Sequence, residues 1–313
     1  MLKKELELSI ISPIYLAENI VDDLVKQIKE NVLCITENFE IILIDDGSHD
    51  NSWLKIEENC KKDHRIKGIR LSKNFGQHYA ISAGLKKCFG NYAIVMDCDL
   101  QHDPIYIKDL INKAEEGFDI VLTKEINTEK SLLRKISSKI FYFIYNLFTS
   151  SDELDAKVGN FSILNYKVIE AFNSTQEYHR HYLMLLKSLG FHSTNIKINH
   201  KKRYEGKSSY GFITLIKLAI DGIISNSDTL LRKTITLGFI YVLFALAYSF
   251  YALFSYFYQG SYPGFTSIII ILLSSTGIIL SSLGIIGIYI GKIFIQVKKR
   301  PLYIIDRMIN IDA

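Results

Sequence analysis

Charge is missing from one long stretch near the C-terminus of the chain. Residues 234–291 include no Asp, Glu, Lys, Arg or His. Two glycines and a proline interrupt the stretch at residues 259–264, which leaves about 25 apolar residues on either side, enough to cross a ~30 Å hydrocarbon layer. We therefore predict two transmembrane helices, 234–258 and 265–291, that form a hairpin.

No secretory signal sequence is predicted at the N-terminus, where the first residues lead directly into a short apolar strand. Basic residues flank the uncharged stretch on both sides: Arg232, Lys233, Lys292, Lys298, Lys299 and Arg300. The positive-inside rule places both flanks in the cytoplasm, which predicts a multi-pass protein of the cytoplasmic (inner) membrane. Its other parts would be a cytoplasmic domain (1–210), a juxtamembrane amphipathic helix (211–233) and a basic cytoplasmic tail (292–313).

Cysteine is scarce, and several familiar binding motifs are absent. The four cysteines show no CxxC spacing, which predicts reduced thiols and no zinc site. No GxGxxG or GxxxxGK[ST] follows a strand-like run, so dinucleotide-binding and P-loop folds lose their main support. The net charge of +4 is spread along the chain and belongs partly to the membrane flanks, so nucleic acid is not an expected partner.

The first half of the chain alternates apolar runs with segments of helical periodicity. Strands are predicted at residues 6–14, 39–44, 66–71, 92–96 and 119–123, and a helix at 20–32. This alternation predicts an α/β fold with a mostly parallel central sheet. Such sheets bind ligands beyond the carboxyl ends of their strands, where this sequence places several polar residues.

Two carboxylates separated by one residue follow the fourth of these runs. Asp97 and Asp99 would face the same side at the end of the strand, and they suit a hard cation that holds a diphosphate. Taken alone, the pattern is more often a solvated turn at the end of a strand. The neighbouring motifs decide between these two interpretations.

Four short motifs occur in a fixed order. They are Ser12-Pro13-Ile14-Tyr15 with Glu18, Ile44-Asp45-Asp46-Gly47-Ser48, Ser72-Lys73-Asn74-Phe75-Gly76, and Asp97-Cys98-Asp99-Leu100-Gln101. In this order they resemble the inverting glycosyltransferases of family 2, which have the GT-A fold. Further stretches at 133–139, 159–161, 203–210 and 299–303 resemble the polyprenyl-phosphate branch of that family, which includes dolichol-phosphate mannosyltransferases and undecaprenyl-phosphate glucosyltransferases.

The resemblance implies donor-binding residues near the ends of the strands. The nucleoside pocket would be lined by Pro13, Tyr15, Glu18, Asp45 and Asp46, and Arg203 with Lys207 would grip the diphosphate. A divalent cation, Mg²⁺ or Mn²⁺, would be held by Asp97, Asp99 and Gln101; the catalytic candidates are Asp97, Asp99 and Arg203. Structural interpretations stay open as well: a strand-end turn at 45–48, a buried ring at Tyr15 and a solvated basic loop at 203–207.

The acceptor side has its own implied residues. Residues 131–149 place apolar side chains at helical spacing with basic side chains on the remaining surface, as in a helix that lies in a membrane interface. Arg134 and Ser138 lie one helical turn apart and would bind a lipid phosphate together with Lys124. An ordinary core-facing helix is the alternative for this segment.

Several positions depart from the family pattern. The usual Gly-Asp-Phe-Arg is Gly159-Asn160-Phe161-Ser162 here, Leu16 replaces an Asn, and Lys124 stands where relatives often have Arg. The first departure removes a carboxylate that could act as a base. A sugar hydroxyl needs such a base, whereas a phosphate monoester with a second pKa of ~6 is already largely a dianion at neutral pH. The departure therefore fits a lipid phosphate as acceptor.

The sequence thus predicts an enzyme that moves a hexose-type sugar from a nucleoside-diphosphate sugar to a polyprenyl (undecaprenyl or dolichyl) phosphate. The product would be a lipid-linked monosaccharide for cell-surface glycan synthesis or modification. Two alternatives stay open: transfer to a hydroxyl on a lipid or glycan, and a non-catalytic membrane relative that binds nucleotide. The GxxxG spacing of Gly287 and Gly291 favours packing against the first span over a homo-oligomer, and the oligomeric state stays open.

Overall fold

The computed structural model describes residues 7–126, 158–175, 177–178, 180–199, 229–259 and 264–311. The chain divides into two compact units. The first contains Met1–Ser131, Asp155–Ser208 and Pro301–Ala313, and the second contains Leu132–Leu154 and Ser209–Arg300. The interfacial helix predicted at 131–149 and most of the amphipathic helix predicted at 211–233 lie outside the described residues.

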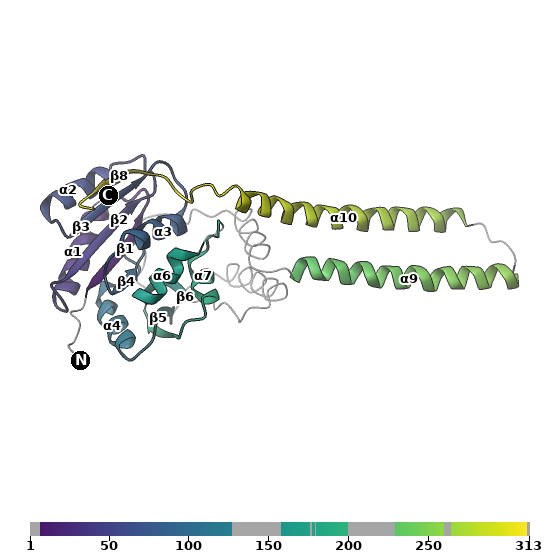
Figure 1. Cartoon of the computed structure of the whole chain (residues 1–313), viewed down its shortest axis with the longest axis horizontal. Coiled ribbons are helices and arrows are strands. Elements are labelled where there is room, and N and C mark those ends of the chain that lie inside the picture. Colours follow the sequence, from purple (N-terminus) through teal and green to yellow (C-terminus); the bar gives the residue numbers. More distant parts are fainter. Residues whose placement is uncertain are drawn as a thin grey trace. The chain divides into compact units, whose positions relative to one another are not determined.

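A sheet of eight strands is the centre of the first unit as far as the structure describes it (Figure 1). In chain order the strands are β1 (Leu8–Ile14), β2 (Phe39–Asp45), β3 (Ile66–Leu71), β4 (Tyr92–Val95), β5 (Ile120–Glu125), β6 (Val158–Asn165), β7 (Ser193–Ile198) and β8 (Ile305–Ile309). Their order in the sheet is β7-β5-β6-β4-β1-β2-β3-β8. The neighbours β4, β1, β2 and β3 are parallel, and β6 and β8 run antiparallel to their neighbours.

The five predicted strands are confirmed to within two residues at each end. Their central residues are buried on both faces of the sheet, so the runs read as continuous apolar segments; all seven residues of β2 are buried. The sequence did not predict β6, β7 or β8, which are antiparallel or lie at an edge of the sheet. The predicted fold class, an α/β fold with a parallel core, is confirmed.

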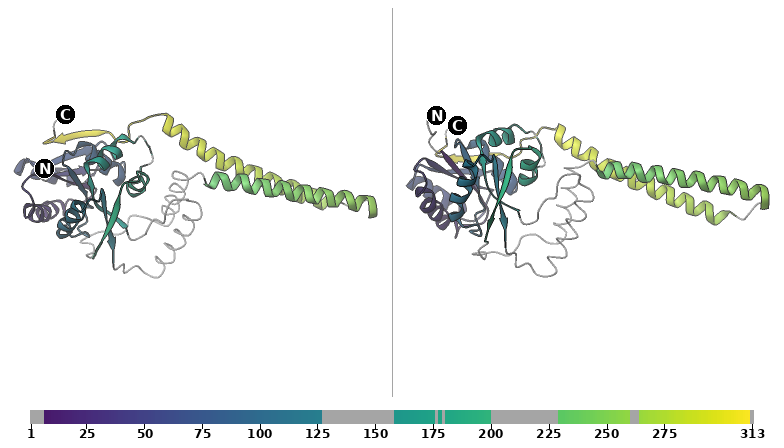
Figure 2. Two further views of the ribbon diagram at one scale, coloured as in Figure 1. Left: turned by 60° about the horizontal axis from the view of Figure 1, so that its bottom comes forward. Right: turned by 90° about the horizontal axis from the view of Figure 1, so that it is seen from below.

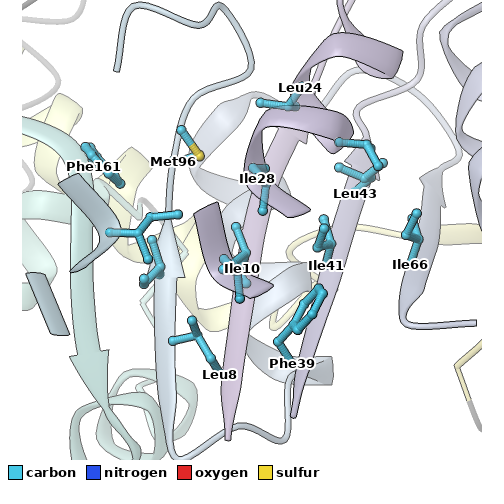
Figure 3. Close-up of a cluster of buried hydrophobic side chains, with 14 of the residues drawn as sticks. Leu8, Ile10, Leu24, Ile28, Phe39, Ile41, Leu43, Ile66, Met96 and Phe161 are labelled. Carbon is cyan, nitrogen blue, oxygen red and sulfur yellow. The ribbon is translucent and has the colours of Figure 1, made fainter. Parts of the chain in front are cut away.

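Helices cover both faces of the sheet, because successive residues of each strand alternate between the faces. On one face lie α1 (Val21–Leu33), α2 (Ser52–Lys62) and α4 (Ile107–Glu115), which follows the short 3-10 helix η1 (Pro104–Tyr106). On the other lie α3 (Gln77–Lys87), α6 (Tyr166–Ser174) and α7 (Tyr182–Ser188). Figure 3 shows the first cluster, in which Leu24 and Ile28 of α1 pack with Ile10 and Ile41 of the sheet. Burying each such side chain contributes about 1.5–3 kcal/mol.

The C-terminal residues belong to the sheet, which the predicted domain boundary at residue 210 did not anticipate. β8 pairs antiparallel with β3, and the Ser72 backbone N–H donates to the Ile304 carbonyl at 2.9 Å. The Asn310 side-chain amide donates to the carbonyls of Cys60 and Ile66, both at 2.8 Å. The segment 292–313 is therefore not a separate tail: its last part completes one edge of the sheet, because β3 would otherwise leave its backbone groups unpaired.

Two long helices make up the described part of the second unit. They are α9 (Thr229–Gln259) and α10 (Phe265–Val297), which lie side by side in all the views of Figures 1 and 2. Within the described residues only Ser274–Val297 of α10 is long and apolar enough to cross a membrane, with a mean hydropathy of 2.1. The apolar segment of α9, Lys233–Tyr248, is shorter. The structure thus supports one membrane-spanning candidate where the sequence predicted two.

Candidate active site

The carboxyl ends of β1, β2 and β4 meet at one edge of the sheet. β1 lies between the other two, with Ile14 opposite Asp45 and Ile11 opposite Val95. Backbone hydrogen bonds continue past the strands, from Asp46 N–H to the Ile14 carbonyl at 2.9 Å and from Met96 N–H to the Ile11 carbonyl at 3.0 Å. The three motifs that follow these strands are thereby held next to one another.

The acidic pair at the end of β2, Asp45 and Asp46, is buried, and other groups of the protein contact both carboxylates. Asp45 is fully buried, accepts the Ser48 N–H at 3.0 Å and lies 3.5 Å from Arg70 Nε. Asp46 is 3% exposed, and its two oxygens accept the backbone N–H groups of Phe75 and Gly76, each at 2.8 Å. Burial raises the pKa of both carboxyls above the usual value, although these donors oppose the shift. Asp46 therefore holds the loop that enters α3.

Gly47 makes this arrangement sterically possible. It has a φ of +69°, and a Cβ at this position would lie 2.3 Å from the carbonyl carbon of Lys73. Only glycine allows the turn after β2 to approach the loop 72–76 so closely. Two of the sequence motifs thus form one packed structure.

The acidic motif after β4 is less buried. β4 ends at Val95, and Asp97, Asp99 and Gln101 are partly exposed in the turn that follows, while Cys98 packs against the first hydrophobic cluster. Burial, with the flanking carboxylates, raises the pKa of the Cys98 thiol to about 12, so it stays protonated. Leu100 has a φ of +55°, and the Asp99 Oδ1 accepts the Gln101 N–H at 3.1 Å. Residues 97 and 99 thus flank a thiol that belongs to the core.

Asp97 also forms a hydrogen bond with Gln77, which directly follows the loop 72–76 that Asp46 holds. The side-chain amide of Gln77, the first residue of α3, donates a hydrogen bond to Asp97 Oδ1. Burial, with the charge of Asp97, raises the pKa of the hydroxyl of Tyr182, a fully buried residue of α7. The sequence analysis identified neither Gln77 nor Tyr182.

The altered motif 159–162 lies beside the acidic turn. β6 pairs with β4 so that Ser162 is opposite Val95, the last residue of β4, and Asn160 lies two residues before Ser162 on β6. The Ser162 hydroxyl donates to the Asn160 carbonyl at 2.8 Å and lies 2.8 Å from the Tyr182 hydroxyl. Neutral side chains therefore occupy both positions, 160 and 162, at which this motif departs from the family pattern.

The other predicted donor and acceptor residues that the structure describes lie around the same edge. Pro13 is buried in β1, while Tyr15 is 43% exposed just beyond its end. Glu18 accepts the Asn51 N–H at 2.9 Å at the start of α2. Lys124 lies at the carboxyl end of β5, which points the same way as β4. Four predicted residues lie outside the described part of the chain: Arg134, Ser138, Arg203 and Lys207.

The side chains of the acidic turn fit a hard divalent cation. Asp97, Asp99 and Gln101 offer oxygen atoms only, which is the donor type that Mg²⁺ and Mn²⁺ prefer. Among the described residues no three His, Cys, Asp or Glu side chains gather as a metal site. A cation held here would need further oxygens from a ligand, as a diphosphate provides.

Comparison with known proteins identifies the family of the chain. A family model described as glycosyl transferase family 2 matches residues 9–172, which include the β1, β2 and β4 motifs. An uncharacterized glycosyltransferase of Synechocystis sp. is 31% identical over 303 residues, 96% of this chain and 95% of that protein.

Two further relatives have more specific names. An undecaprenyl-phosphate 4-deoxy-4-formamido-L-arabinose transferase of Pseudomonas fluorescens is 31% identical over 310 residues, 96% of this chain and 90% of that protein. A transferase of the same name from Shewanella sediminis is 30% identical over 304 residues, 95% of this chain and 91% of that protein. The similarity extends over nearly the full length of each relative.

Proposed function

The chain belongs to glycosyltransferase family 2 and is a glycosyltransferase of the GT-A fold, and on this premise we propose that it transfers a hexose-type sugar from a nucleoside-diphosphate sugar to a polyprenyl phosphate. The observation that supports the proposal most is that the acidic residues 97–101 follow β4 at the edge where β1 also ends, with the neutral motif 159–162 on the neighbouring strand β6. The relatives named for undecaprenyl-phosphate transfer support the same class of acceptor.

The reaction is a single displacement. An oxygen of the lipid phosphate attacks the anomeric carbon, the bond from that carbon to the diphosphate oxygen breaks, and the sugar is inverted. The nucleoside diphosphate leaves with the bonding electron pair. A dianionic phosphate has no proton to lose, so the neutral Asn160 does not impede the step.

We assign the predicted residues at the carboxyl ends of the strands, and those outside the described part, to separate parts of the donor and the acceptor. Pro13, Tyr15, Glu18, Asp45 and Asp46 border the nucleoside pocket, with Asp46 acting mainly through the loop that it holds. Mg²⁺ or Mn²⁺, held by Asp97, Asp99 and Gln101, would neutralise charge on the leaving diphosphate. Arg203 and Lys207 would contact the diphosphate, and Lys124, Arg134 and Ser138 the acceptor phosphate.

The membrane brings the lipid to the enzyme in this proposal. α10, and α9 beside it, would form a hairpin in the cytoplasmic membrane with the catalytic unit on the cytoplasmic side. The variant Ser261→Cys, with its new thiol between the helices, should react with an impermeant maleimide added outside intact spheroplasts, while exposed Cys34 should react only after lysis. Labelling of Cys34 from outside, or labelling of the thiol introduced by Ser261→Cys only after lysis, would contradict this topology.

The reaction is tested with detergent-purified protein, undecaprenyl phosphate, and labelled UDP-, GDP- and dTDP-sugars, with Mg²⁺ or Mn²⁺. We expect labelled lipid with one donor and none with Asp99→Ala. Donor binding without transfer to the lipid phosphate across the whole panel would contradict the proposal and favour a hydroxyl acceptor or a non-catalytic role.

A further inference from the structure

We propose that Gln77 is a positioning residue that orients the Asp97 carboxylate toward the bound cation, and that Asp46 fixes Gln77 in place through the loop 72–77. The inference rests on the proposed function, since it assigns Asp97 to a cation and diphosphate site. It joins the motif after β2 to the motif after β4, which are far apart in the sequence.

The first step is the attachment of the loop 72–77. Both oxygens of Asp46 accept backbone N–H groups from its end, those of Phe75 and Gly76. Its start is held by the hydrogen bond from Ser72 N–H to the Ile304 carbonyl, which belongs to the C-terminal segment before β8. Hydrogen bonds from backbone amides to a buried carboxylate are among the stronger ones in proteins. The loop is therefore fixed at both ends.

The second step is the direction that this attachment gives to Gln77. Gly76 has a φ of +105°, and α3 begins at the next residue, Gln77. The side chain of Gln77 then reaches across to Asp97 Oδ1 and donates its amide N–H. The position of the amide thus depends on the two bonds that Asp46 makes just before it.

The third step concerns the chemical nature of the donor to Asp97, which is the primary amide of Gln77. A primary amide donates a hydrogen bond without adding charge, so Asp97 keeps its full negative charge for a cation, which a lysine or arginine at the same place would neutralise. With one oxygen fixed by Gln77, the carboxylate has a defined orientation. Groups that orient metal-binding side chains typically change metal affinity 10–100-fold when they are removed.

The test measures Mn²⁺ binding directly, by the electron paramagnetic resonance signal of free Mn²⁺, with full-length protein and UDP, GDP or dTDP. Gln77→Met keeps the length of the side chain and removes the donor, and we expect Mn²⁺ to bind about ten-fold more weakly. Gln27→Met on α1, a partly exposed glutamine outside the site, is the matched control and should leave the affinity unchanged. An unchanged Mn²⁺ affinity in Gln77→Met would overturn the inference.

A double-mutant cycle tests the link from Asp46 to Gln77. Asp46→Asn should also weaken Mn²⁺ binding, and the double variant should lose no more affinity than the weaker-binding single variant, because both changes break one connection. Fully additive losses would overturn the role of Asp46. No lipid takes part in these titrations. Weaker Mn²⁺ binding in Gln77→Met without any sugar transfer by the wild-type protein would support the positioning role and contradict the proposed acceptor.

Discussion

The two acidic pairs at the edge of the sheet have similar sequences and different surroundings. Asp45 ends β2 and Asp46 follows it; both are almost fully buried and accept backbone N–H groups, and Asp45 lies 3.5 Å from Arg70 Nε. Asp97 and Asp99 follow β4 and are partly exposed. The two strands flank β1, so the pairs occupy equivalent places on its two sides.

This difference separates buried carboxylates that pair with the protein from carboxylates that solvent can reach. A buried carboxylate must be paired, because an unpaired charge in the interior costs several kcal/mol. A partly exposed carboxylate loses less hydration and remains accessible to a cation with its own oxygen ligands. We therefore expect substitutions of Asp45 and Asp46 to lower mainly the stability of the protein. Substitutions of Asp97 and Asp99 should lower mainly its activity.

Removal of Asp99 should have the largest effect. Asp99→Asn is expected to reduce sugar transfer by about 10³-fold, since it removes stabilisation of the leaving diphosphate, and to leave the melting temperature nearly unchanged. Initial rates at saturating donor measure the first quantity, and thermal unfolding in detergent the second. If the variant melted several degrees lower than the wild type, Asp99 would stabilise the fold. It would then not differ from the buried carboxylates Asp45 and Asp46.

The converse change is Asp46→Asn. It replaces one acceptor oxygen with an amide that faces a backbone N–H, and we expect the free energy of unfolding of the catalytic unit to fall by about 2–3 kcal/mol. Thermal unfolding followed by Trp53 fluorescence measures this, because the indole is buried in the same unit. Asp46→Ala should be at least as destabilising, and a variant as stable as the wild type would contradict the structural role.

A third change makes the region beside Asp97 more acidic. Asn160→Asp restores the usual family residue on β6, next to β4, and adds a negative charge where the acceptor phosphate would approach. Transfer to undecaprenyl phosphate should fall about ten-fold, which corresponds to about 1.4 kcal/mol. An increase would favour a hydroxyl acceptor that needs a base.

Asp63 offers a partnered carboxylate away from the site. Arg65 and Lys29 hydrogen-bond to it and hold its pKa well below the usual value of 3.8. Because the folded pKa is the lower one, this contribution is present above pH 3.8 and is lost as the pH falls toward the folded value. Asp63→Asn should cost about 1 kcal/mol at pH 7, and the cost should shrink below pH 4. Transfer activity should not change, and a loss of activity at equal stability would contradict this assignment.

Leu16 should give the smallest effect. It has a φ of +51° at the end of β1, and a left-handed conformation costs a leucine about 1 kcal/mol. Leu16→Asn should raise the melting temperature by about 2–3 °C, since asparagine tolerates this conformation better. Its side chain is 44% exposed, so little burial is lost. An unchanged melting temperature would mean that strain at this edge is negligible.

The sequence predicted the parallel core and the acidic edge well, and it did so from local patterns. β1 to β5 are apolar runs at regular intervals, and Asp97 and Asp99 follow one of them directly. β8 was missed because Ile305–Ile309 is short, contains two charged residues and follows a basic flank. Its place in the sheet depends on pairing with β3, more than two hundred residues earlier, which no local pattern indicates.

The roles within the site were harder to predict for a similar reason. Asp45, Asp46, Asp97 and Asp99 are alike in sequence, and only the fold decides which pair is buried. Gln77 directly follows the motif at 72–76, and this position in the sequence could have indicated that it lies near the site. Tyr182 had no such signal, because its contact with Ser162 joins α7 to β6 through the folded core.

The most direct test of this contrast is the rise in melting temperature caused by Mn²⁺ with a nucleoside diphosphate, measured for the wild type, Asp99→Asn and Asp46→Asn. We predict that Asp99→Asn melts like the wild type without ligand and loses the rise, because the ligand no longer binds the folded state. Asp46→Asn should melt several degrees lower without ligand and keep a reduced rise. A normal melting temperature with no rise in Asp46→Asn would contradict the account, because it would make Asp46 a ligand-binding group rather than a support of the fold.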